Sequence, residues 1–129
     1  MATITLSNPD GAPKPAPSYS QAVLVTGEAR RLVISGQVGI TPDGTILDDP
    51  EAQIGQVFAN LSAILKAHGM APANIVKTTV FLTDIALLGA LRTKRAAFMQ
   101  GHTPASTLLI VAGLADPRFQ VEIEAEAVA

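Results

Sequence analysis

Apolar and polar residues recur along the chain with two different periods, which mark the predicted elements. Between Asp49 and Gly69, apolar residues follow the three- and four-residue spacing of one helical face. Asp49 suits the N-cap, Pro50 the first helical position and Gly69 the position after the last turn. The pattern therefore predicts a helix between Asp49 and Gly69.

The second half of the chain predicts two strands, a helix and a final strand. Residues 75–82 are rich in β-branched side chains, and 107–111 form a short apolar run typical of a buried strand. Between them, Asp84 is predicted to cap a helix that ends near Met99. This helix is expected to bury Leu87, Leu88, Leu91 and Phe98. Residues 119–128 alternate, which predicts a strand with one face against helices and one acidic face.

The N-terminal third predicts an arm followed by a hairpin. Residues 8–17 contain four prolines and a glycine, which favour an extended arm over the surface. Residues 22–25 and 32–38 are rich in Val, Ile and Leu, and Gly27 lies between them. We expect these two runs to pair with each other as a hairpin.

The order of the elements predicts one α+β domain over residues 1–129, in which two helices cover one face of a mixed sheet. The chain is 48% hydrophobic and only 16% charged, which is apolar for so small a domain. We expect a partner subunit to cover part of that surface, for instance in an oligomer that closes its sheets into a central barrel.

Composition argues against several classes of function. The absence of cysteine excludes disulfides, and two histidines offer no cluster of metal ligands, so a metal cofactor is not expected. A net charge of -2, a pI near 5.5 and the lack of tryptophan argue against nucleic-acid binding. No apolar run is long enough to cross a bilayer and the N-terminal residues do not resemble a signal peptide, so a cytoplasmic protein without membrane contact is expected.

A series of segments resembles, in order, the motifs of the Rid/YjgF family, the RidA-like proteins of the endoribonuclease L-PSP superfamily. The segments read PSYSQAV from Pro17, VISGQVGITPDG from Val33, NLSAILKAHGM from Asn60, IVKTTVFLTD from Ile75, TPAS from Thr103 and VEIEAEA from Val121. The resemblance implies a chorismate-mutase-like (YjgF-like) fold. It also implies a homotrimer with a central barrel and small-molecule clefts between subunits.

The resemblance further implies an activity and a set of site residues. Better-studied members hydrolyse reactive enamines and imines to a 2-oxo acid and ammonia, without a cofactor. Glu122 matches the family's catalytic glutamate. The residues matching positions that line the family's cleft are Tyr19, Ser35 and Gly36.

The chain departs from the family at one position that matters for the chemistry. Deaminating members have an arginine directly after Pro-Ala, whereas this chain has Ser106. A charge-assisted hydrogen bond contributes roughly 1.5 to 3 kcal/mol. The loss of two such bonds would weaken carboxylate binding on the order of 100-fold or more. Arg92 and Arg95 lie three residues apart on the second predicted helix, so we hypothesise that one of them binds the anion instead and alters substrate specificity.

Other interpretations of these residues remain open. A solvated helix face is more typical of Arg92 and Arg95 than an anion clamp is, and a neutral filler is more typical of Ser106 than a ligand contact. Glu122 also fits one of three acids on an exposed strand face. His102, in a polar loop, is expected to be exposed. An alternative function is a non-catalytic trimer that binds a metabolite or acts like a chaperone, and the third, least favoured by the acidic pI, is a ribonuclease.

Overall fold

The computed structural model describes residues 2–12, 14–27 and 29–129, and within these ranges it has two separate sheets and two long helices. Strands β1 (Thr3–Ser7) and β2 (Ala22–Thr26) form an antiparallel pair. The main sheet has the order β3-β6-β4-β5, built from β3 (Arg31–Val38), β4 (Ile75–Leu82), β5 (Ala105–Ile110) and β6 (Val121–Val128). Strand β6 is antiparallel to both neighbours, whereas β4 and β5 are parallel, so the predicted mixed sheet is confirmed.

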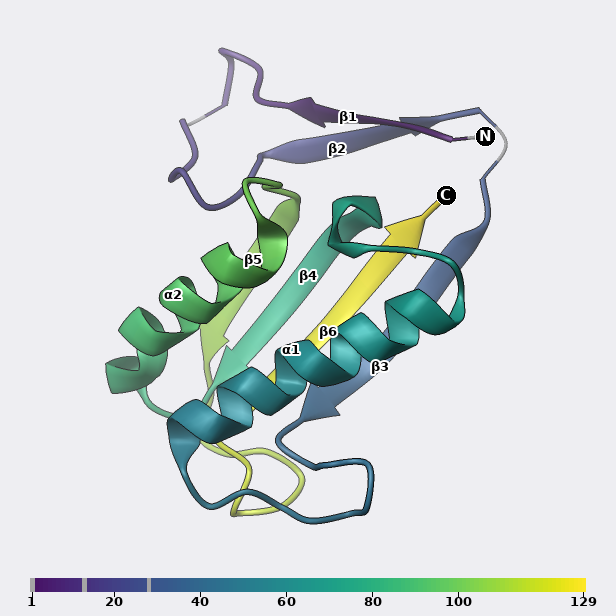
Figure 1. Cartoon of the computed structure of the whole chain (residues 1–129). Coiled ribbons are helices and arrows are strands. Elements are labelled where there is room, and N and C mark those ends of the chain that lie inside the picture. Colours follow the sequence, from purple (N-terminus) through teal and green to yellow (C-terminus); the bar gives the residue numbers. More distant parts are fainter. Residues whose placement is uncertain (1, 13, 28) are drawn as a thin grey trace.

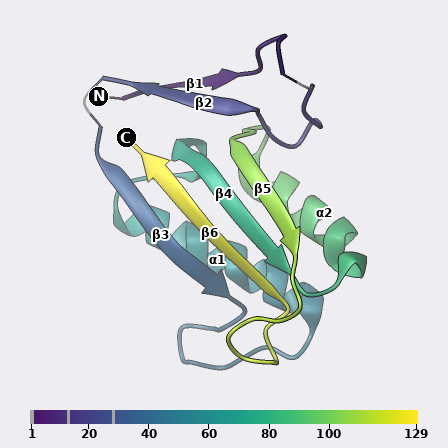
Figure 2. The same ribbon diagram turned by 180° about the vertical axis from the view of Figure 1, so that it is seen from behind.

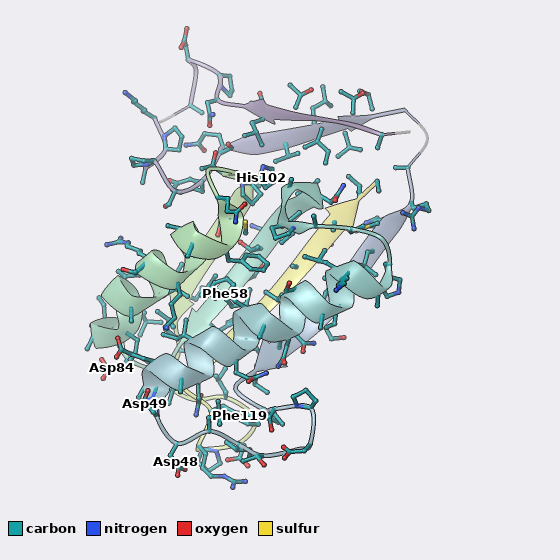
Figure 3. All side chains as sticks on the ribbon, in the orientation of Figure 1. Asp48, Asp49, Phe58, Asp84, His102 and Phe119 are labelled. Carbon is teal, nitrogen blue, oxygen red and sulfur yellow. The ribbon has the colours of Figure 1, made fainter. Side chains whose placement is uncertain are left out.

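Both long helices cover the same face of the main sheet, as predicted (Figure 1). Helix α1 (Pro50–Ala67) begins where expected, because the Asp49 carboxylate accepts a hydrogen bond of 2.8 Å from the Ala52 amide. Asp84 caps the 3-10 turn η2 (Ile85–Leu87), which leads directly into helix α2 (Leu88–Met99). The two capping aspartates lie at the same end of the sheet (Figure 3).

The core lies between the helices and the sheet. The fully buried apolar side chains of α1 are Ile54, Val57, Leu61 and Leu65. The Phe58 and Phe98 rings pack 4.9 Å apart between centroids and join α1 to α2. Of the residues predicted to be buried on α2, Leu91 is fully buried, and Leu87, Leu88 and Phe98 are partly buried against the core.

The opposite face of the main sheet carries no helix (Figure 2). Strand β6 alternates as predicted: Val121 and Ile123 point into the core, whereas Glu122, Glu124 and Glu126 point away from the helices. Strand β5 matches the predicted position but not the predicted burial, because Leu109 and Ile110 are 42% and 46% exposed. The reason is its place at the edge of the sheet, where only β4 flanks it as a full strand.

The predicted hairpin between residues 22–25 and 32–38 is wrong for the single chain. Both segments are strands, but β2 pairs with β1 and β3 pairs with β6. The cause is an anchor before β2. The Ser20 amide donates to the Pro104 carbonyl at 3.1 Å, the Ser20 hydroxyl donates to the Thr103 carbonyl at 2.6 Å, and Ser20 forms a parallel bridge with Ala105. These contacts hold the chain at the β5 edge, across the sheet from β3.

An N-terminal strand, β1, was not predicted from the sequence, since residues 3–7 are too short and polar to stand out. The described part of residues 8–17 contains neither helix nor strand, in agreement with the predicted arm.

Candidate functional site

One cavity brings together four of the residues singled out in the sequence. It encloses about 260 Å³ between the N-terminal segment, α2 and β5. The cavity, called here the arginine pocket, is lined by Ala16, Ser18, Tyr19, Leu88, Arg92, Arg95, Ser106 and Leu108. The arginine pocket therefore combines two positive charges with the phenol of Tyr19 and the hydroxyl of Ser106, and part of its wall is apolar.

Arg95 is the most unusual residue of the arginine pocket, because it is only 9% exposed. It forms no salt bridge with any residue that the structure describes, where the ion pairs are Arg31–Glu126 and Arg118–Asp116. Burial lowers the pKa of Arg95 below its ordinary value, and the charge of Arg92 lowers this pKa further. No fully buried side-chain nitrogen among the described residues lacks a hydrogen-bond partner, so the guanidinium of Arg95, which has no partner there, keeps some contact with solvent. A partly desolvated cation without a counter-charge still carries a cost. An anionic ligand in the pocket would remove that cost.

Ser106 adds a neutral hydrogen-bonding group to the same pocket. The buried Thr78 hydroxyl on β4 donates to Ser106 Oγ at 2.9 Å, which orients the serine. A hydroxyl has one proton and two lone pairs, so Ser106 keeps its own proton for a ligand. The serine is thus part of the pocket lining, and its short side chain leaves room that an arginine would occupy.

A second cavity of about 160 Å³ adjoins the arginine pocket and shares Ser18, Arg92 and Arg95 with it. His102 lines this cavity beneath the N-terminal arm (Figure 3), with Nε2 2.7 Å from the Ile75 carbonyl oxygen. The prediction that His102 is exposed is therefore wrong, because this hydrogen bond holds the ring against β4.

The other three predicted site residues gather at the β3–β6 pair, on the face of the sheet without helices. Glu122 lies between Val38 of β3 and Phe81 of β4 in the strand register. A Cβ atom added to Gly36 would fall 1.8 Å from Glu122 Oε2, so the carboxylate lies directly over this glycine. Ser35 is exposed beside it, where the β3 register shifts between Ile34 and Gln37. We call Ser35, Gly36 and Glu122 the glutamate site.

Within one chain the arginine pocket and the glutamate site are separate. Ser106 and Thr78 lie on the helix-covered face, whereas Glu122 and Phe81 point to the opposite face. Strand β4 also lies between β5 and β6, and Thr78 and Phe81 are three residues apart along it. The single chain therefore keeps the arginine pocket and the glutamate site apart.

Sequence reasoning missed several residues of the arginine pocket. Thr78 was read only as part of a strand, and its hydrogen bond to Ser106 depends on the parallel register of β4 and β5. Leu88 was predicted as core, yet it also lines the pocket wall beside Arg92, as Leu108 does from β5. For Leu88 and Leu108 the only sequence signal was that they lie close to Arg92 and Ser106 on the same elements, and Thr78 carried no such signal.

The described residues form neither a metal site nor a membrane-spanning helix. No group of three or more His, Asp and Glu side chains there is arranged to hold a metal ion. In the same part of the chain, neither helix is long and apolar enough to span a membrane.

The fold defines a class of protein, an α+β domain with two helices on one face of a mixed sheet. This chain adds to that fold a cationic pocket and a glutamate on one strand of the sheet. The family described as Endoribonuclease L-PSP matches residues 10–129. The chain is 41% identical over 120 residues to 2-iminobutanoate/2-iminopropanoate deaminase of Rattus norvegicus, covering 91% of this chain and 84% of that protein. It is 47% identical over 75 residues to a RutC family protein of Aquifex aeolicus, covering 57% of this chain and 58% of that protein.

A solved structure supports the same assignment. The Rid-family protein YyfB of Yersinia pestis, described as of unknown function, superimposes with a TM-score of 0.87 at 32% identity, covering 98% of each chain. The chain belongs to the Rid (YjgF/RidA) family of Endoribonuclease L-PSP proteins. The predicted fold class and the resemblance drawn from the sequence are thereby confirmed.

Proposed function

We propose that the protein is a cofactor-free deaminase of small 2-imino and enamine acids, in which Arg95, assisted by Arg92, binds the substrate carboxylate. The observation that carries the proposal is the buried Arg95 without a counter-charge in the arginine pocket. Relatives named 2-iminobutanoate/2-iminopropanoate deaminase support the reaction class, since their named substrates are imines of carboxylic acids.

The proposed reaction needs only water and proton transfer. Glu122 takes a proton from a water molecule as the water oxygen attacks the carbon of the protonated imine, which gives a neutral carbinolamine. The carboxylic acid returns that proton to nitrogen, and the resulting carboxylate takes the hydroxyl proton as the C–N bond breaks, which releases ammonia and a 2-oxo acid. The proton then passes from Glu122 to the departing ammonia or to solvent. An enamine first gains a proton on carbon to become the imine. Arg95 and Arg92 hold the carboxylate throughout, and a fixed geometry of this kind lowers the entropic part of the barrier.

Because the arginine pocket and the glutamate site are separate in one chain, the reaction requires a second copy. We propose a homotrimer with its ligand between subunits, as the family resemblance implies. In each cleft the arginine pocket of one copy would face the glutamate site of the next. A heterologous interface whose rotation closes after three copies gives a ring with three equivalent clefts.

The position of the two arginines on α2 implies a changed specificity. An anion on Arg95 lies beside α2, which leaves the space next to Ser106 and Leu108 for the substrate's side chain. We therefore expect imino acids with larger apolar side chains to react faster than 2-iminopropanoate.

The test is a comparison of Arg95→Met with Lys94→Met. Both remove one positive charge from α2, but Lys94 Nζ lies towards Gly55 of α1 and does not line the pocket. The imino acids are generated with an amino-acid oxidase, and their decay is measured above the buffer rate. We expect kcat/KM to fall about 100-fold for Arg95→Met, because roughly two charge-assisted hydrogen bonds are lost. Lys94→Met should stay within about twofold of wild type, since surface charges contribute little.

A second variant separates catalysis from binding. Glu122→Gln keeps the shape of the side chain but cannot accept a proton, so kcat should fall by about 10² to 10⁴-fold. Binding of a stable 2-oxo acid, measured by calorimetry, should remain as in wild type. If the wild type accelerates no imine and still binds the 2-oxo acid, the protein is a metabolite-binding member and the catalytic proposal is wrong.

A further inference from the structure

Strands β2 and β3 follow each other in the sequence, and each has one edge without a partner strand among the described residues. In the single chain these two edges do not pair with each other. Within the described residues, β2 pairs with a strand only through β1, and β3 only through β6. Leu24 of β2 is 57% exposed and Val33 of β3 is 65% exposed. An isolated two-stranded sheet is marginally stable in water, and an open edge invites another strand.

The open edges of β2 and β3 are complementary in sequence and register. Four residues, 27–30, separate the end of β2 at Thr26 from the start of β3 at Arg31. An antiparallel pairing that begins with Thr26 opposite Arg31 places Leu24 directly opposite Val33. These are the most exposed large apolar side chains of the two strands. Cross-strand pairs of this kind stabilise a sheet.

One chain cannot make this pairing while Ser20 stays on β5. Ser20 bridges Ala105 on the outer side of β5, and the open edge of β3 is the opposite edge of the main sheet. With strands about 4.8 Å apart, Ser20 beyond β5 and the position beyond β3 where β2 would pair are separated by about five strand spacings, or roughly 24 Å. Ala22, which the pairing places opposite Ser35, is two residues from Ser20 and reaches at most about 7 Å. The hairpin instead crosses the end of the sheet (Figures 1 and 2).

We infer that the β1–β2 hairpin bridges two copies of the chain: it stays anchored to β5 of its own copy and adds β2 to the β3 edge of the neighbouring copy. A second copy fits this edge because it carries the same β3, and exchange of an identical element is an accessible route to oligomers. The added pair extends each main sheet beyond four strands and covers Leu24 and Val33.

The same register joins the two parts of the proposed site. Continued past Ala22, it places Tyr19 opposite Val38 of the neighbouring copy, and Val38 pairs with Glu122 on β6. Tyr19 lines the arginine pocket, so the neighbour's Glu122 would lie about two strand spacings, roughly 10 Å, from it along the backbone. This part of the inference rests on the proposed function, whereas the strand pairing does not.

Disulfide cross-linking between two single variants tests the pairing without any assay of activity. The wild type has no cysteine, so Leu24→Cys and Val33→Cys each introduce the only thiol of the chain. The two proteins, one with a size tag, are unfolded, mixed, refolded and oxidised, and the linked peptides are identified by mass spectrometry. We expect a 24–33 disulfide between tagged and untagged chains. A mixture of Leu24→Cys with Leu109→Cys, an exposed position on β5, should give at least tenfold less cross-link.

The double variant Leu24→Cys/Val33→Cys tests the alternative, in which β2 pairs with β3 of its own chain. A disulfide found only within single chains, together with no cross-link in the mixture, would show that β2 returns to its own β3 and overturns the inference. The absence of a 24–33 disulfide in both experiments overturns it as well, because the two positions then do not pair.

Subunit mixing tests the shared site. Arg95→Met and Glu122→Gln are each expected to be inactive, but refolded together they should recover about a quarter of wild-type activity, since a random ring contains clefts with both parts intact. Recovery no greater than the sum of the separate variants, in a protein whose wild type is active, contradicts the shared site. An inactive wild type with a positive cross-link contradicts the proposed function alone.

Discussion

The close packing of Gly36 against Glu122 gives a prediction whose size follows from the geometry. A methyl group at Gly36 would lie 1.8 Å from Glu122 Oε2, 2.7 Å from Cδ and 2.9 Å from Cγ. Since non-bonded Cβ atoms do not approach within 3.0 Å, the carboxylate must move by at least about 1.2 Å. Displacement of a reacting group by about 1 Å can reduce a rate about 100-fold. We therefore expect Gly36→Ala to lower kcat/KM for imine hydrolysis by about that factor.

The stability of the Gly36→Ala variant should change much less than its activity. Gly36 does not have a positive φ, so alanine fits the backbone, and the atoms that the added methyl group meets belong to the Glu122 side chain and not to the backbone. An off-rotamer side chain costs of order 0.5 to 1.5 kcal/mol, and urea unfolding should show a loss of that size. Gly113→Ala is the control, because nothing lies within 4 Å of its added Cβ, and both activity and stability should remain as in wild type.

A double variant decides whether the loss acts through Glu122. If it does, Gly36→Ala/Glu122→Gln should be no slower than Glu122→Gln alone, because the displaced carboxylate is already absent. Wild-type kcat/KM in Gly36→Ala, or losses that multiply in the double variant, would refute the assignment of Glu122 as the reacting carboxylate.

Two further predictions concern stability and are measured by urea unfolding. Gln53→Leu should cost about 3 kcal/mol, because the buried Gln53 amide donates to the Leu47 and Arg118 carbonyls and accepts from the Gln120 amide, three bonds that leucine cannot make. Its control, Gln56→Leu, loses one bond to a side chain and should cost less than about 1 kcal/mol; equal losses would contradict the account. Gln100→Gly should stabilise the protein by about 1 kcal/mol, since Gln100 has a φ of 49° at the end of α2; a destabilised variant would show that this conformation carries no strain.

The helix and strand predictions succeeded where local signals agreed. For α1, periodicity, the Asp49 cap and Pro50 all indicate the same start, and the core side chains of the helix are those of its apolar face. Strand β4 has the predicted bounds for the same reason, since its β-branched run is uninterrupted. Pairing between strands was harder to predict. The partner of β2 depends on the Ser20 anchor to Pro104 and Ala105, about 85 residues later in the chain, and no local pattern signals such a contact.

The separation of Glu122 from Arg92 and Arg95, in contrast, was already implicit in the alternation of the last strand. The pattern of residues 119–128 predicts that Glu122 faces away from the helices, and the structure confirms this, while Arg92 and Arg95 belong to a helix on the covered face. A rigid sheet lies between the two groups, and no side chain reaches through it. If Glu122 and Arg95 act on one small substrate, they must therefore come from different chains. The proposed function and the subunit arrangement are thus linked, and the mixing of Arg95→Met with Glu122→Gln tests that link directly.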